Sequence, residues 1–186
     1  LVVSLKNSFG LPDWVLGIAP LLFVYAPVWL CYFRKVSSWE YQLSIPAFKD
    51  WASWKQALKL CLLVNLAIWI WYIPLYHGWT SGIWGKEFIG LLPESLLLTV
   101  AYHLFYVAIP EEIFYRGYFQ TRLNEMYARR WIIFGTPIGM GAVVASLFFA
   151  FGHSLVSFQW WHFATFFPGL IFAWMRERTG GIVAGA

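Results

Sequence analysis

Long uncharged apolar stretches, separated by short polar segments, dominate the chain. No Asp, Glu, Lys or Arg occurs at positions 14–33, 60–85, 95–110 or 131–175. An apolar stretch of about 18 or more residues without charge is typical of a transmembrane helix. The last stretch has room for two helices joined by a turn around residues 157–161. The pattern therefore predicts an all-α, polytopic transmembrane helix bundle with about five spans.

The composition agrees with this pattern. Of the 186 residues only 12% are charged and 60% are hydrophobic, with a mean hydropathy of +0.61. Soluble domains carry about 25% charged residues, so this chain has too little charge to cover a water-exposed surface. Disorder is excluded as well, because it requires low hydrophobicity and high net charge. The sequence indicates an integral membrane protein.

Basic residues alternate along the chain between rich and poor connecting segments. They follow the first, third and fifth apolar stretches, at Arg34, Lys35, Lys49, Lys55 and Lys59, at Arg122, Arg129 and Arg130, and at Arg176 and Arg178. The segment between the second and the third stretch contains a single basic residue, Lys86. Because cytoplasmic loops hold the excess of Lys and Arg, we expect the N-terminus outside and the last residues at the cytoplasmic face. The net charge of +4 does not indicate nucleic-acid binding.

The segment between the first two spans mixes charge with Trp. We expect residues 34–59 to form an interfacial amphipathic loop, with a short helix over residues 47–59. Cys31 and Cys61 lie at the inner ends of the first two spans, and we expect two buried thiols there.

Three ionisable side chains stand at the end of the third span, in Pro110-Glu111-Glu112-Ile113-Phe114-Tyr115-Arg116. Ionisable groups in a membrane helix cost about 2.5–3.5 kcal/mol each on insertion scales, so they are functional candidates by default. On a helix Glu112 and Arg116 share a face and can pair, whereas Glu111 points about 100° away. Glu111 would then remain able to accept a proton, as a general base must. The alternative is a purely structural polar network that includes Tyr115.

The fourth span ends in Phe149-Ala150-Phe151-Gly152-His153, and His153 can act either as a hydrogen-bonded interfacial residue or as a catalytic one. For His103 and His162 we expect a structural role, and for His77 a place in a loop. The chain contains no His-Glu-x-x-His or Gly-x-Ser-x-Gly motif. Its two aspartates, Asp13 and Asp50, lie outside the spans. Of the usual hydrolytic groups only a glutamate–histidine pair remains.

Glu111-Glu112-x-x-x-Arg116, followed by Phe149-x-x-x-His153, resembles the first two motifs of the CPBP family. This family comprises CaaX-prenyl-protease and bacteriocin-processing intramembrane proteases, also called the Abi type. The resemblance implies that Glu111 activates a water for peptide-bond cleavage and that His153 assists. Glu112 and Arg116 would hold the geometry of the site, and Phe149 would pack beside it.

A third stretch agrees with the family. Phe166-Phe167-Pro168-Gly169-Leu170 and Arg178-Thr179-Gly180-Gly181 resemble its Gly-Leu segment and its Arg-Thr-Gly turn. The resemblance covers about residues 90–186, so we divide the chain into N-terminal membrane helices (1–89) and a protease core (90–186). The substrate implied is a membrane-anchored or lipidated protein, and the location a bacterial inner membrane.

One family motif is missing. The family's His-x-x-x-Asn should follow the Thr-Gly turn, but the sequence stops at Ala186, and His162 is followed four residues later by Phe166. We therefore expect a chain truncated before its last core helix. For Glu111 and His153 to share a water they must lie within about 12 Å of each other. This requires the fourth span to begin late, at Thr136-Pro137, where Pro suits a first helical turn.

Two other functions are compatible with these residues. The resemblance implies no metal cofactor, but Glu111, Glu112 and His153 can be read as zinc ligands, although their spacing matches no common zinc pattern. The same residues can also form a structural network in a non-catalytic membrane scaffold or a small transporter. A transporter usually shows paired broken helices or internal repeats, and the sequence has none.

Overall fold

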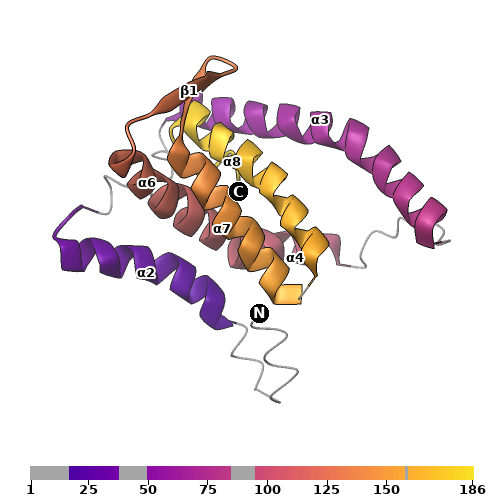
Figure 1. Cartoon of the computed structure of the whole chain (residues 1–186), viewed down its shortest axis with the longest axis horizontal. Coiled ribbons are helices and arrows are strands. Elements are labelled where there is room, and N and C mark those ends of the chain that lie inside the picture. Colours follow the sequence, from indigo (N-terminus) through magenta and orange to yellow (C-terminus); the bar gives the residue numbers. More distant parts are fainter. Residues whose placement is uncertain (1–16, 38–49, 85–94, 158) are drawn as a thin grey trace.

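The computed structural model describes residues 17–37, 50–84, 95–157 and 159–186, and these are mostly helical (Figure 1). The elements are α2 (Ile18–Arg34), α3 (Trp51–Trp84), α4 (Leu96–Tyr102), η2 (His103–Ala108), α5 (Ile109–Glu111), η3 (Glu112–Gln120), α6 (Thr121–Met126), β1 (Arg130–Ile133), β2 (Thr136–Gly139), α7 (Met140–Ser157), η4 (Trp160–Thr165) and α8 (Phe166–Thr179). The elements from α4 to α6 form one continuous helix, Leu96–Met126. The fold class is therefore confirmed as mostly helical.

Among the described residues, two helices are long and apolar enough to cross a membrane, α3 over Trp51–Trp79 and the continuous helix Leu96–Met126. The apolar parts of α2 and α7, Pro20–Arg34 and Met140–Leu155, are shorter. Of the short helix expected over residues 47–59, positions 47–49 lie outside the described residues, and the expected end at Lys59 is wrong. α3 begins at Trp51 and runs through this segment into the second apolar stretch, because no Gly or Pro interrupts it before Pro74.

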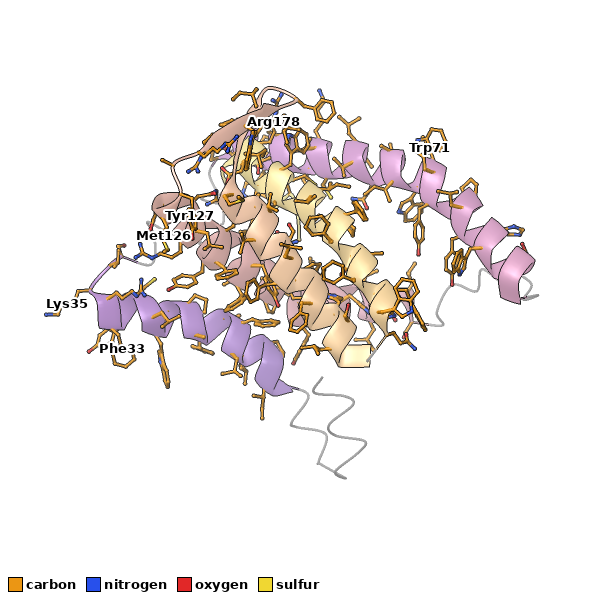
Figure 2. All side chains as sticks on the ribbon, in the orientation of Figure 1. Phe33, Lys35, Trp71, Met126, Tyr127 and Arg178 are labelled. Carbon is orange, nitrogen blue, oxygen red and sulfur yellow. The ribbon has the colours of Figure 1, made fainter. Side chains whose placement is uncertain are left out.

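The second half of α3 extends away from the other helices (Figure 1). Its first half packs on the bundle through Ala57, which lies with Met175 and Ala184 in one buried cluster. Farther along, Trp71 is 74% exposed and points away from the bundle (Figure 2). Apolar side chains on every side are expected of a helix that lies in lipid rather than in a protein core.

The continuous helix departs twice from α-helical geometry. η2 and η3 are π-helical, and η3 covers nine residues from Glu112 to Gln120. Such π-helical segments are rare and occur frequently at functional sites. Here the second of them holds Glu112 and Arg116 and begins directly after Glu111, so the unusual backbone coincides with the candidate site.

A β-hairpin, which the sequence analysis did not predict, precedes α7. β1 pairs antiparallel with β2, and Pro137 lies opposite Ile132. Phe134 and Gly135 form the turn with positive φ angles of 48° and 73°. The expectation that Pro137 opens the fourth span is thus wrong, because Pro137 belongs to β2 and α7 begins at Met140. The late start that the site requires is nevertheless present.

Small residues let the helices of the core approach closely. Ala142, Ala145 and Ala150 of α7 and Ala173 of α8 are buried. A Cβ atom on Gly169 would lie 3.2 Å from Cβ of Ser146. Membrane helices pack through such small residues because lipid supplies no hydrophobic driving force between helices.

A buried polar stripe ties the continuous helix to α8. Glu112, Arg116, Gln120 and Asn124 recur every fourth residue, and all four are buried. Arg116 donates to the carbonyl of Gly169, Gln120 to that of Ala173, and Asn124 to the carboxylate of Glu177. The sequence offset is 53 residues in each bond, so the two helices run parallel with their register fixed by polar contacts.

Glu177 of α8 accepts hydrogen bonds from the last two residues of this stripe. Its Oε1 accepts from Gln120 Nε2 at 2.8 Å, Asn124 Nδ2 at 2.9 Å and Arg176 Nη1 at 2.9 Å.

We expect Glu177→Ala to lower the free energy of unfolding by about 1–3 kcal/mol, because three donors lose one charged acceptor. Unfolding in mixed micelles measures this loss. Glu125→Ala removes an exposed ion pair with Arg122 and should cost less than about 1 kcal/mol. Equal losses for the two variants would contradict the prediction.

Candidate active site

The centre of the candidate site is a buried ion pair. Glu112 and Arg116 are 3% and 0% exposed, and Arg116 Nε lies 3.4 Å from Glu112 Oε1. The pairing expected from their spacing is present. A charge this deeply buried is tolerated only where an opposite charge or hydrogen bonds compensate it.

Aromatic rings enclose the Arg116 guanidinium. Its carbon lies 4.3 Å from the ring centroid of Phe149, 5.6 Å from that of Phe172 and 5.8 Å from that of Tyr115. Ring faces attract cations, so these contacts add to the ion pair. Phe149 therefore packs directly against the charged pair, in the place that the sequence resemblance implied for it.

Glu111 stands beside this pair but not in it. Its side chain is only half-buried, whereas that of the next residue is fully buried. The positive charge of Arg116 acts on both carboxylates. Phe23 of α2 stacks on Phe114 at 5.1 Å and meets Tyr115 edge-on at 5.6 Å, so α2 covers the neighbouring face. Glu111 is thus the more accessible of the two carboxylates.

His153 belongs to the same aromatic cluster. Its ring lies 4.3 Å from that of Phe149, which meets Tyr115 edge-on at 5.3 Å. Its Nδ1 lies 3.0 Å from the carbonyl oxygen of Phe149. A carbonyl can only accept, so Nδ1 carries a proton and donates to it. Phe149 thus contacts both His153 and Arg116, and the first two sequence motifs meet in space.

The other histidines lie in helices away from these contacts. His103 bonds the carbonyl of Thr99 within its own helix at 2.8 Å. His162 is half-buried in η4. His77 lies inside α3, so its expected place in a loop is wrong: helix α3 continues to Trp84 despite Gly78. Of the two thiols that we expected to be buried, that of Cys31 is buried, whereas that of Cys61 is only half-buried.

The C-terminal residues close the site over Glu112. A Cβ atom on Gly185 would lie 2.5 Å from Glu112 Oε2 and 3.0 Å from its Cδ. Ile182 and Ala184 are buried and fix this segment in the bundle. A larger residue at position 185 would therefore require the Glu112 carboxylate to shift.

Within the described residues no three His, Cys, Asp or Glu side chains lie close enough together to hold a metal ion. A zinc site normally needs three protein ligands or more. Glu112 is already engaged by Arg116. These residues do not fit the zinc site formulated as the alternative.

The sequence analysis missed several polar residues of the site. Gln120 and Asn124 extend the buried stripe, and Glu177 accepts a hydrogen bond from each of them. The signal was present in the spacing, because polar residues recur every fourth position from Glu112 onwards. The Tyr115 hydroxyl approaches Gly152, where an added Cβ would lie 3.2 Å away. Only the packing of η3 on α7 reveals that contact.

Comparison with known proteins identifies the family. Residues 93–186, just over half of the chain, match the Rce1-like type II CAAX prenyl endopeptidases. No curated protein and no solved structure matches the chain. That family is membrane-integral and its activity is that of a CAAX-type intramembrane protease. The matched segment contains the buried ion pair, His153 and the polar stripe, and the chain belongs to the Rce1-like type II CAAX prenyl endopeptidase family.

Proposed function

We propose that this protein is an intramembrane endopeptidase that cleaves a peptide bond near the terminus of a prenylated or otherwise lipidated membrane protein. The observation that supports it most is the buried Glu112–Arg116 pair beside the half-buried Glu111, in a helix long enough to cross a membrane. Such groups are costly in lipid and are retained where they function. We place the protein in a bacterial inner membrane as a multi-pass protein with its N-terminus outside.

In the proposed mechanism Glu111 acts as the general base. It removes a proton from a water, whose oxygen adds to the scissile carbonyl carbon. The protonated Glu111 then returns the proton to the leaving amine as the C–N bond breaks. Its partial exposure beside a fully buried partner supports this role, because the base must reach both water and substrate.

His153 assists through Nε2. Because Nδ1 donates to the carbonyl of Phe149, the imidazole is held in one orientation. Nε2 then accepts a hydrogen bond from the attacking water and aligns it. A close approach of Glu111 and His153 through this water remains a prediction.

Glu112, Arg116 and Phe149 hold the geometry. The ion pair fixes the backbone that carries Glu111, and Phe149 connects Arg116 with His153. We propose no metal in the reaction. Metal analysis of the purified protein tests this, and stoichiometric zinc whose removal abolishes cleavage would contradict it.

The substrate class is tested with the full chain in lipid vesicles. We expect cleavage of a farnesylated peptide that ends in a CaaX sequence, detected as loss of the last three residues by mass spectrometry. The matched control is the same peptide without the farnesyl group, which should be cleaved at least about tenfold more slowly because it lacks the buried apolar chain. No cleavage of any lipidated peptide would favour the non-catalytic scaffold or transporter.

Gly185→Ala tests whether the close approach of Gly185 fixes the position of the Glu112 carboxylate. The added methyl group would overlap the Glu112 carboxylate and push it away from Arg116. We expect kcat to fall about tenfold, since displacements of about 1 Å can cost up to 10²-fold. Adding Glu112→Asp, which is one methylene shorter, should restore part of the lost rate.

Gly78→Ala is the matched control, because an added Cβ there meets nothing within 4 Å. It should leave kcat unchanged and slightly stabilise α3. If Gly185→Ala and Gly78→Ala show the same kcat, Gly185 does not position Glu112.

A further inference from the structure

The turn of the β1–β2 hairpin holds large apolar side chains open to the surroundings. Phe134 is 86% exposed and Ile132 is 72% exposed. A mobile loop could fold such side chains back onto the protein, but this turn is held in place. Trp174 Nε1 donates to the carbonyl of Ile133 at 3.1 Å, and Arg178 Nη1 donates to that of Phe134 at 3.2 Å. The exposure of the tip is therefore built into the fold.

Three arginines flank the hairpin, Arg129 and Arg130 at the start of β1 and Arg178 beside the turn. Arg129 stacks over the Trp131 ring at 5.2 Å. Arg130 donates to the backbone carbonyls of Tyr127 and Asn124. Arg178 donates to neutral oxygens of the hairpin. In the part of the chain that the structure describes, none of the three forms an ion pair. The three arginines Arg129, Arg130 and Arg178, together with the exposed Ile132 and Phe134, make up what we call the hairpin face, which combines apolar side chains with positive charge.

A further exposed cation stands beside an aromatic ring. Lys55, near the start of α3, stacks over Trp51 at 5.6 Å, which repeats the Arg129–Trp131 arrangement. Trp residues and cations together are typical of a membrane–water interface.

The helix that precedes the hairpin sets its depth. Leu96–Met126 has 31 residues. Its length of about 46 Å exceeds the apolar core of a bilayer, which is about 30 Å thick. β1 begins four residues after its end, at Arg130. We therefore expect the hairpin to lie near the level of the lipid headgroups.

We propose that the hairpin face binds the anionic phospholipid headgroups of the bilayer, with Phe134 and Ile132 inserted just below the phosphates. The guanidinium groups, which form no ion pair among the described residues, favour anionic over neutral lipid. The apolar tip holds this end of the helix bundle at the membrane surface. This inference is independent of the proposed peptidase activity.

The test places p-benzoylphenylalanine at position 134 of the full chain, in vesicles of equal parts phosphatidylglycerol and phosphatidylcholine. After illumination, mass spectrometry identifies the adducts. We expect lipid adducts in which phosphatidylglycerol exceeds phosphatidylcholine about fivefold or more, because each cation near an anionic surface contributes about fivefold in partitioning. Arg129→Gln should lower this ratio while lipid adducts persist.

The same photoreactive residue at position 71 is the matched control, since Trp71 is exposed on the far half of α3 (Figure 2). It should crosslink to both lipids without preference. Equal amounts of the two lipid adducts at position 134 would overturn the proposal. So would the absence of lipid adducts there, or crosslinks to a second protein chain instead of lipid.

Discussion

Glu111→Gln is expected to lower the cleavage rate of a prenylated CaaX peptide by about 10²–10⁴-fold. Glutamine keeps the size and the hydrogen-bonding atoms of the side chain but cannot take a proton from water. Glu111 is only half-buried and is not the carboxylate paired with Arg116, so the thermal stability of the variant should stay close to that of the parent. Single-turnover cleavage in vesicles, together with a melting curve, measures both quantities.

Glu125→Gln is the control for this prediction, because it makes the same chemical change in an exposed ion pair at the end of the continuous helix. It should leave the rate unchanged. Glu112→Gln should differ from both, since removing the partner of the buried Arg116 lowers stability as well as rate. Full cleavage by the Glu111→Gln variant would leave the structural network as the better explanation of these residues.

Arg116→Met is expected to have the largest effect on stability, a loss of about 3–5 kcal/mol in the free energy of unfolding. Methionine fills similar space but leaves the Glu112 carboxylate buried without its counter-ion. The variant also loses the hydrogen bond to Gly169 and the contact with the Phe149 ring, at 3.2 Å and 4.3 Å respectively. Reversible unfolding in mixed micelles measures the loss.

The double variant Glu112→Gln with Arg116→Met separates the charge from the packing. If the uncompensated carboxylate causes most of the loss, neutralising it should recover a substantial part of the stability. Losses that simply add in the double variant would show that the ion pair contributes little beyond side-chain packing.

Local sequence patterns predicted the parts of this protein that depend on local chemistry. The uncharged stretches indicated the helices, because an apolar helix needs only its own backbone bonds and a lipid or protein environment. The spacing of Glu112 and Arg116 predicted their ion pair, because residues four apart on a helix share a face. The extent of α3 was predicted less well, since no local signal marks where an amphipathic start becomes a membrane helix.

The hairpin escaped prediction for a different reason. Residues 130–139 lie in an apolar stretch that is also compatible with a helix, and Pro137 suits a first helical turn as well as a strand. Its conformation is settled by contacts with α8, where Trp174 and Arg178 bind the carbonyls of the turn. Those partners lie more than forty positions away in sequence.

By itself the sequence determined that this is a helical membrane protein with ionisable groups concentrated around residue 112, because hydrophobicity and helical periodicity are properties of neighbouring residues. Only the tertiary structure decided that Phe149 contacts both Arg116 and His153. The same holds for the hydrogen bond from Gln120 to Glu177 and for the close approach of Gly185 to Glu112. Apart from that between Phe149 and His153, these contacts join residues more than thirty positions apart. Side-chain shape and the register of packed helices select them, and no local pattern encodes either property.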